Sequence, residues 1–293
     1  MDTQVLTRRE LEDLVAAISD EVVRRMNSPA GEASQPVGKP SARDELGKGR
    51  PRNPEPAPAS PHAIRLTPDV RALASLIDHT LLRPEATRAQ VEQLCDEALQ
   101  AGFAAVCVNP AWAPVAAQRV RSSGVRVATV VGFPFGATST VAKRAEAEAA
   151  ILAGAQEVDM VMNVGAMRSG DLERVEYDIR GVVELCHAAG VIVKVILENA
   201  YLTDAEKVAA CEIAKRAGAD FVKTSTGFGP HGATEADVRL MRQAVGPAMG
   251  VKAAGGIRTL SDALRMLQAG ATRLGTSASL SILAEAAELG ARG

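Results

Sequence analysis

Two lysines stand inside short runs that otherwise have the composition of buried strands. Lys223 lies in the run 220–227 and Lys252 in the run 250–256, and each run leads directly into a turn that contains glycine. Lysine is almost never buried without a partner or a task. A neutral amine can attack a carbonyl carbon, and a nearby cation can keep that amine neutral at pH 7. The two positions therefore indicate amine chemistry.

The segments that carry these lysines belong to a repeating pattern that starts at about residue 63. Eight β-rich runs alternate with helical stretches, and the runs cover residues 76–80, 104–109, 125–132, 157–164, 192–198, 221–226, 249–253 and 272–275. The clearest helical stretches cover residues 138–153, 171–189, 203–217 and 259–269. Glycine C-caps are expected where helices lead into strands, at Gly102, Gly154, Gly190, Gly218 and Gly270.

Eight such units over about 230 residues predict an α/β fold, a (β/α)8 TIM barrel with its catalytic groups at the carboxyl ends of the strands. The alternative is an open doubly wound sheet, but no GxGxxG follows the first run. Polar residues near the strand ends are candidates for the site: Asp78, His79, Thr80, Asn109, Asp159, Asn163, Lys194, Glu198, Lys223, Thr224, Ser225 and Lys252. Of these, Lys194 and Glu198 could instead form an ion pair inside the barrel, and Asp159 could simply neutralise a lysine.

Glycine-rich loops follow the last two runs, at residues 255–259 and 275–277, and each leads toward a helix. Glycine lets backbone N–H groups approach an anion, and a helix N-terminus favours negative charge. Barrels often bind a phosphate in these two loops. Together the loops predict a phosphate cradle.

The bulk composition excludes several classes of function. The chain has 293 residues and a formal net charge of −2, which gives no sign of nucleic-acid binding. No apolar run reaches the roughly 18–20 residues that span a bilayer. The four cysteines form no CxxC pair and the four histidines lack metal-site spacing, so we predict reduced thiols, no metal and no cofactor.

The first 62 residues differ from the rest. Residues 1–26 contain an amphipathic helix signal over 7–26, in which the apolar stripe is Leu11, Leu14, Val15, Ile18 and Val22. Residues 27–62 contain eight prolines and few apolar side chains, which predicts a disordered linker. The predicted domains are therefore 1–26, 27–62 and the barrel at 63–293.

Four segments, in order, give the barrel a resemblance to a known family. Residues 77–82, 157–161, 223–228 and 252–258 resemble deoxyribose-phosphate aldolase, and the resemblance runs from about residue 66 to 285. It implies a metal-free class I aldolase with a (β/α)8 barrel. Such an enzyme interconverts 2-deoxy-D-ribose 5-phosphate with acetaldehyde and D-glyceraldehyde 3-phosphate.

The resemblance also implies roles for individual residues. Lys223 would form the Schiff base, Lys252 would lower its pKa, and Asp159 would relay protons through water. The implied substrate-binding residues are Asp78, Thr80 and Thr224 near the sugar, and Gly227, Gly255, Gly256, Arg258, Gly275 and Ser277 around the phosphate. Some members carry a lysine where this chain has Phe228, so phosphate affinity is expected to depend more on backbone amides. The roles of His231 and Cys107 stay open.

Several alternatives remain at this point. The barrel could be a related Schiff-base aldolase or a transaldolase acting on another sugar phosphate, or a catalytically reduced microcompartment cargo protein. The first 26 residues resemble an encapsulation peptide, which implies a shell-protein partner for residues 7–26 and a cytoplasmic location within a bacterial microcompartment. An oligomerisation or other docking helix is the alternative. We expect a homo-oligomer, a dimer, and no nucleic-acid or membrane partner.

Overall fold

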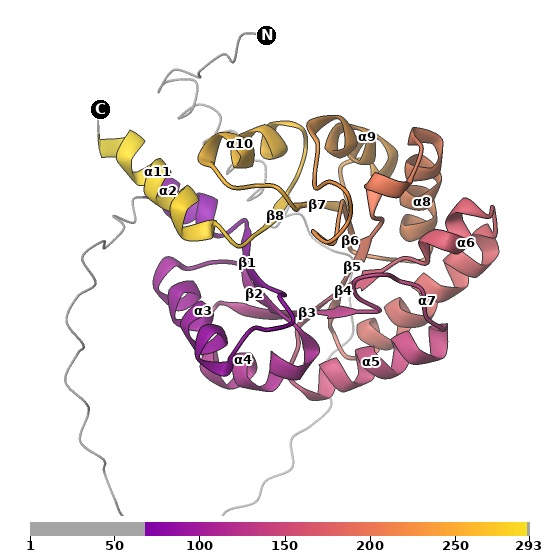
Figure 1. The fold of residues 1–293 in the computed structure, drawn as a ribbon, viewed down its shortest axis with the longest axis horizontal. Helices are drawn as coiled ribbons and strands as arrows, with labels where there is room; N and C mark the ends of the chain where they lie inside the picture. Colours follow the sequence, from indigo (N-terminus) through magenta and orange to yellow (C-terminus); the bar gives the residue numbers. More distant parts are fainter. Residues whose placement is uncertain (1–67, 292–293) are drawn as a thin grey trace, which may run out of the picture.

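Eight parallel strands close into a barrel in sequence order in this computed structural model, which confirms the predicted (β/α)8 TIM barrel (Figure 1). The structure describes residues 68–291, so the predicted segments 1–26 and 27–62, and residues 63–67 of the predicted barrel domain, lie outside the described residues. The strands are β1 (Ile77–Leu81), β2 (Ala105–Val108), β3 (Arg126–Val131), β4 (Glu157–Val161), β5 (Ile192–Ile196), β6 (Phe221–Lys223), β7 (Gly250–Ala254) and β8 (Arg273–Thr276).

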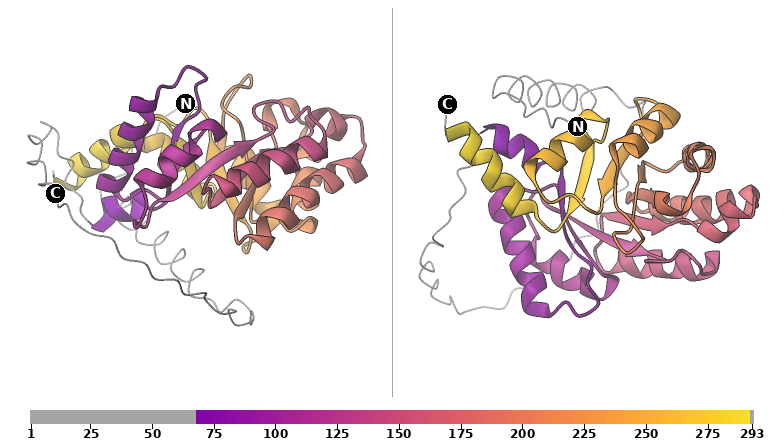
Figure 2. Two further views of the ribbon diagram at one scale, coloured as in Figure 1. Left: turned by 90° about the horizontal axis from the view of Figure 1, so that it is seen from below. Right: turned by 45° about the horizontal axis from the view of Figure 1, so that its top comes forward.

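Helices surround the barrel on its outer side, as the views in Figures 1 and 2 show. They are α2 (Pro68–Ala74), α3 (Arg88–Ala101), α4 (Ala113–Arg119), α5 (Thr140–Leu152), α6 (Val164–Arg168), α7 (Leu172–Ala188), α8 (Asp204–Arg216), α9 (Glu235–Val245), α10 (Leu260–Gln268) and α11 (Ser279–Ala291), with the short 3-10 helices η1 (Pro110–Trp112) and η2 (Asn199–Tyr201). The first and last described helices, α2 and α11, pack against each other beside β1 and β8. None of the helices in residues 68–291 is long and apolar enough to cross a membrane.

Local signals set the ends of these helices. Thr87, Thr203 and Thr259 each form a capping box at the start of α3, α8 and α10. All five glycines expected after helices have positive φ, which confirms the predicted C-caps. The ends of these helices are therefore determined by local sequence, without the help of tertiary contacts.

Some predicted strands are too long at their carboxyl ends. The runs 192–198 and 221–226 end as strands at Ile196 and Lys223. Beyond Lys223, the Thr224 backbone still bonds to Lys252 and Asn199, and its side chain adds bonds to the backbone of Ala254 before the chain forms loops at the barrel mouth. The residues predicted as strand but found beyond the strand ends, 197–198 and 224–226, therefore lie at the mouth of the barrel, near the site.

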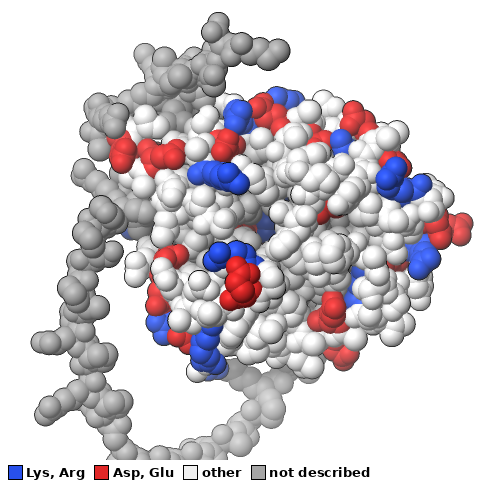
Figure 3. Space-filling view, in the orientation of Figure 1, with Lys and Arg blue, Asp and Glu red and all other residues white. Residues whose placement is uncertain are grey.

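The main apolar core lies between the sheet and the helices, whereas the barrel interior holds both charged side chains and a small apolar cluster from β2 and β3. Alternate strand residues such as Val222 and Val251 pack outward into the main core between sheet and helices. The inward positions of β6 and β7 carry Lys223 and Lys252, which are paired in register. Strand period and register together place the two lysines side by side inside the barrel. On the face in Figure 3, acidic and basic side chains are interspersed, with no large patch of one sign.

At the amino end of β7, the structure leaves no space for a side chain at Gly250. Gly250 of β7 lies in register with Phe221 of β6, and a Cβ at Gly250 would lie 2.1 Å from the Phe221 ring. We therefore expect Gly250→Ala to lower the free energy of unfolding by about 1–3 kcal/mol, the usual cost of overpacking. Urea denaturation measures the change. Gly124→Ala is the control, because a Cβ at Gly124 would meet no atom within 4 Å. Equal effects in the two variants would contradict the steric account.

Candidate active site

Asp159 on β4 gathers three buried lysines around one carboxylate. Its Oδ2 atom lies 2.8 Å from Lys223 Nζ and 2.7 Å from Lys252 Nζ, and its Oδ1 atom lies 2.7 Å from Lys194 Nζ. At most 3% of any of these lysine side chains is exposed. The two lysines singled out from the sequence therefore share a single oxygen of Asp159.

Two more carboxylates extend this into a network. Asp78 on β1 accepts hydrogen bonds from Lys252 and, at 2.7 Å, from Arg273 on β8. Glu157 on β4 lies 2.5 Å from Lys194 Nζ and 3.3 Å from the Arg273 guanidinium. The interior network thus consists of Asp78, Glu157, Asp159, Lys194, Lys223, Lys252 and Arg273. The half-exposed Arg126 also pairs with Glu157, at 3.2 Å, so the cationic side chains around the three carboxylates outnumber them.

Among the three lysines around Asp159, the environment lowers the pKa of Lys223 alone. Burial is the largest single contribution to the pKa of each lysine, and by itself it would lower all three values. For Lys252, the carboxylates of Asp159 and Asp78 outweigh burial and raise its pKa. For Lys194, three carboxylates outweigh burial and likewise raise the pKa. For Lys223, Asp159 opposes burial but the nearby Lys252 charge reinforces it, and the pKa stays below its ordinary value.

Asp159 and Asp78 remain ionised in this setting. Burial raises the pKa of each carboxyl, but the surrounding cations outweigh it, and both pKa values fall below their ordinary range. Groups of this kind stabilise the fold above the unfolded-state pKa, near 4. Their contribution is lost as the pH falls further, toward the pKa of the folded state.

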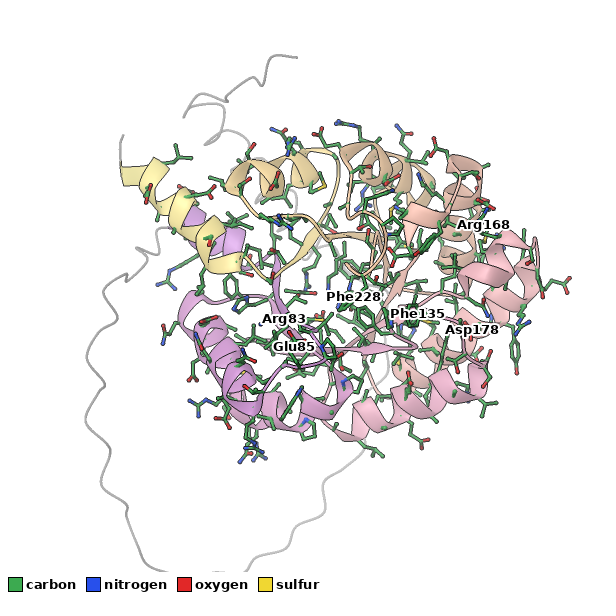
Figure 4. All side chains as sticks on the ribbon, viewed as in Figure 1. Arg83, Glu85, Phe135, Arg168, Asp178 and Phe228 are labelled. Carbon is green, nitrogen blue, oxygen red and sulfur yellow. The ribbon has the colours of Figure 1, made fainter. Side chains whose placement is uncertain are left out.

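A cavity of about 690 Å³ opens above Lys223 at the carboxyl ends of the strands. Eight of the predicted site residues line it: Thr80, Lys223, Gly227, Gly255, Gly256, Arg258, Gly275 and Ser277. The other four, Asp78, Asp159, Thr224 and Lys252, are buried and do not line it. Figure 4 shows Arg83, Glu85 and Phe228 over the middle of the barrel on this face. A larger cavity, about 1040 Å³, is lined by residues around the amino ends of the strands and contains none of the predicted site residues.

The two predicted phosphate loops meet at this cavity. Gly255 and Gly256 have φ values of 84° and 79°, which favour glycine, and a Cβ at Gly255 would lie 3.0 Å from the Gly232 backbone. The backbone amides of Arg258 and Thr259 already donate to the Asp262 side chain, at 3.1 Å each. Arg258 can therefore offer an anion its guanidinium rather than its amide.

Another group of residues at the cavity was only partly visible in the sequence. His79 Nδ1 lies 2.9 Å from Ser279 Oγ at the start of α11, and His79 Nε2 lies 2.7 Å from Glu97 Oε2 on α3. Burial lowers the pKa of His79, against the opposing effect of Glu97. The sequence feature that could have pointed to Glu97 is its helical spacing from Gln90 and Gln93, which also line the cavity.

Two interpretations of strand-end residues need correction or completion. The alternative of an ion pair between Lys194 and Glu198 is wrong, because Lys194 contacts Asp159 and Glu157. Residues 194 and 198 would share a face only if the strand continued, but β5 ends at Ile196 and Glu198 has φ 55°. Asn163 caps α6 by accepting from the Ala166 amide at 3.0 Å.

Both residues whose roles stayed open lie outside the cavity wall. Cys107 on β2 is fully buried, and burial raises the pKa of its thiol, so it has the character of an unreactive core thiol. His231 is exposed, and its ring lies 3.0 Å from the Gly232 carbonyl oxygen.

A closed parallel barrel with a buried lysine at the base of a glycine-lined cavity has the arrangement that a class I, lysine-dependent aldolase requires. The chain belongs to the DeoC/LacD family of aldolases, whose family model matches residues 72–285. It is 57% identical over 211 residues to deoxyribose-phosphate aldolase of Streptococcus pneumoniae serotype 19F (strain G54), covering 72% of this chain and 95% of that protein. It is 56% identical over 213 residues to the Thermococcus gammatolerans deoxyribose-phosphate aldolase, with the same two coverages.

A solved structure agrees with this assignment. Deoxyribose phosphate aldolase from Aeropyrum pernix is 37% identical to this chain and superposes with a TM-score of 0.69. The match covers 73% of this chain and 90% of that one. The similarity in sequence and in fold therefore extends over the barrel.

The interior network predicts a large stability effect at Arg273. Replacing Arg273 by Met leaves Asp78 and Glu157 buried with fewer cationic partners, so we expect the free energy of unfolding to fall by about 3–5 kcal/mol. Denaturant titration at pH 7 measures it. Arg265→Met is the control, because Arg265 pairs with Asp262 and Glu235 at the surface and should change stability by less than about 1 kcal/mol. A small effect at Arg273 would contradict the network.

Proposed function

We propose that this chain catalyses the reversible cleavage of 2-deoxy-D-ribose 5-phosphate to D-glyceraldehyde 3-phosphate and acetaldehyde, through an imine on Lys223. The similarity to deoxyribose-phosphate aldolases over 95% of their length supports the reaction. The observation that carries the mechanism is that, among residues 68–291, Lys223 is the one buried lysine that both lines the cavity and has a lowered pKa. Such an amine is a nucleophile at neutral pH.

The chemistry follows from a neutral Nζ at the base of the cavity. Lys223 attacks the aldehyde carbon C1 of the open-chain sugar, and loss of water gives a protonated imine. The C2–C3 bond then breaks as the C3 hydroxyl loses its proton, and the bonding electrons move toward the imine nitrogen. D-Glyceraldehyde 3-phosphate leaves. Protonation of the remaining enamine at C2, followed by hydrolysis, releases acetaldehyde and restores the lysine.

Lys252 and Asp159, which lie below Lys223 inside the barrel, would tune its charge and move its protons. Lys252 stays charged, and its like charge favours the neutral form of Lys223. The Oδ2 atom of Asp159 accepts from both amines and gives protons a short path between them and the cavity water. Asp78 acts through Lys252, because its buried carboxylate is already paired with Lys252 and Arg273.

The substrate would lie along the cavity with its phosphate on the glycine loops. The amides near Gly227, Gly255, Gly256, Gly275 and Ser277, and the Arg258 side chain, surround the phosphate end. Thr80 contacts a sugar hydroxyl, while Thr224 supports the wall through its bonds to Ala254. A related aldolase or transaldolase acting on another sugar phosphate would leave deoxyribose 5-phosphate uncleaved in a coupled acetaldehyde assay.

Trapping identifies the imine-forming lysine. With acetaldehyde and borohydride, we expect a two-carbon adduct on the peptide that contains Lys223, because its amine is the neutral one. Peptide mass spectrometry locates the adduct. The Lys223→Arg variant should take up no label, and EDTA should leave wild-type turnover intact. Label on Lys252 in the wild type would reverse the two roles.

The pH profile tests the tuning role of Lys252. Activity requires neutral Lys223, so the rate rises as pH increases through the pKa of Lys223. Removing the positive charge in Lys252→Met raises that pKa, since Asp159 is then opposed by one cation fewer. The rising limb of kcat/KM should therefore move to higher pH, with the rate at pH 7 reduced by about 10²–10⁴-fold. An unshifted limb would remove this explanation.

We also propose that residues 7–26 direct the enzyme to the shell of a bacterial microcompartment within the cytoplasm. The support is the amphipathic pattern of these residues and the proline-rich segment that joins them to the barrel. The enzyme itself would be a homo-oligomer, a dimer.

A fusion of residues 1–26 to a fluorescent protein should co-localise with co-expressed shells from the same host, because its apolar stripe would dock into the shell. Fluorescence microscopy detects it, and Leu14→Glu with Ile18→Glu should abolish it. Deleting residues 1–62 should leave kcat/KM nearly unchanged. A wild-type fusion that stays diffuse contradicts shell binding, and self-association of that fusion favours oligomerisation.

A further inference from the structure

Glu198 is a buried carboxylate that the lysine chemistry does not use. It follows β5 at the mouth of the barrel, and only 3% of it is exposed. Its backbone lies in the left-handed region, with φ 55° and ψ 63°. In residues 68–291, Ser122 is the only other non-glycine residue with positive φ. Strained backbone of this kind concentrates at functional sites.

The side chain of Glu198 holds the turn that follows β6. Its Oε2 atom accepts a hydrogen bond from the Thr226 amide at 3.2 Å and a second, short one from the Thr226 hydroxyl. Because the hydroxyl proton is directed to the carboxylate, Thr226 Oγ1 is available to accept from the Phe228 amide, at 3.0 Å. One carboxylate oxygen thereby fixes both ends of the turn 226–228.

The rest of the turn is packed around this carboxylate. A Cβ at Gly229 would lie 3.0 Å from both Cδ and Oε1 of Glu198, so the chain passes directly over the carboxyl group. On the outer side, the Phe228 ring makes an edge-on contact with Phe133, with centroids 5.4 Å apart. The turn is therefore held between an aromatic contact and a buried anion, over the middle of the barrel (Figure 4).

Gly227 is at the centre of the turn and lines the cavity beside Lys223. Its φ of 89° is one that residues with a side chain rarely adopt. The two amides that flank it are already engaged, that of Thr226 by Glu198 and that of Phe228 by the Thr226 hydroxyl oxygen. We propose that Glu198 is a positioning residue for phosphate: its carboxylate holds the turn 226–228 so that Gly227 presents its backbone to the phosphate group of the substrate.

The proposal rests on the proposed function for the identity of the substrate, but not for the anion itself. Glu198 touches no reacting atom in this scheme, and its hydrogen bonds matter more than its charge. Glutamine keeps an oxygen that can accept both bonds from Thr226, whereas alanine keeps none. The negative charge of Glu198 also repels a bound phosphate, so removing that charge should by itself increase phosphate affinity. The two substitutions therefore separate positioning from acid–base chemistry.

Steady-state kinetics should compare Glu198→Ala and Glu198→Gln on 2-deoxy-D-ribose 5-phosphate and on unphosphorylated 2-deoxy-D-ribose. We expect Glu198→Ala to raise KM for the phosphorylated sugar by about 10–100-fold, the loss expected for hydrogen bonds to a charged group. Its kcat, and both constants for the unphosphorylated sugar, should change by less than about threefold, and Glu198→Gln should restore most of the KM. A fall in kcat for both substrates in Glu198→Gln would overturn the proposal in favour of an acid–base role.

A second variant and a matched control complete the test. Thr226→Val should reproduce the selective rise in KM, and the double variant with Glu198→Ala should add nothing further. If Glu198→Ala fails to fold, Thr226→Val decides, and an unchanged KM there refutes the proposal. The control is Glu206→Ala, because Glu206 makes the same pair of bonds to Thr203, at 2.7 and 2.9 Å, on the exposed start of α8. It should leave both KM values unchanged.

Calorimetric titration with inorganic phosphate separates this inference from the proposed reaction. Wild-type protein and Glu206→Ala should bind phosphate equally, and Glu198→Ala and Thr226→Val should bind it at least about tenfold more weakly. Equal binding by all four proteins would overturn the positioning role. A wild type that binds phosphate with this dependence but does not cleave deoxyribose 5-phosphate would refute the proposed function alone.

Discussion

The shared carboxylate of Asp159 is the interaction on which the barrel interior depends. Three lysine amines within 2.8 Å of one carboxylate cannot all be stabilised equally. Lys194 and Lys252 each have a further carboxylate partner, whereas Lys223 makes its one ion pair with the Asp159 oxygen that Lys252 also uses. The positive charge of Lys223 is therefore the least compensated of the three in this buried site, and its pKa is lowered.

This arrangement needs the closed barrel around it. Hydrogen-bonded parallel strands satisfy every interior backbone group along the ladder, and the inward side chains are left to interact with one another. Arg273 supports the network from β8 by bridging Asp78 and Glu157. The polar residues near the strand ends thus lie at two levels of the barrel. Asp78, Glu157 and Asp159 lie beneath the cavity with the lysines, and the glycine loops line the cavity above them.

The loops at the mouth are held by polar contacts of the same kind. Asp262 takes the first amides of the segment before α10, His79 links α3 to the start of α11, and Glu198 ties down the turn after β6. Each contact removes freedom from a segment that lines the cavity. Since binding an anion through backbone amides requires those amides to be aimed beforehand, such contacts reduce the ordering cost of binding.

The sequence by itself determined the eight βα units, the glycine C-caps and the positions of Lys223 and Lys252, because strand period, helix capping and left-handed glycine are local properties. The resemblance carried by residues 223–228 and 252–258 identified the family for the same reason. Only the tertiary structure decided that Asp78, Asp159, Thr224 and Lys252 lie beneath the cavity rather than in its wall. It also decided that Glu198 holds Thr226 and leaves Lys194 to other partners. Those outcomes depend on the register between strands distant in sequence and on a single left-handed residue where β5 ends, and neither is encoded in the spacing of residues along one strand.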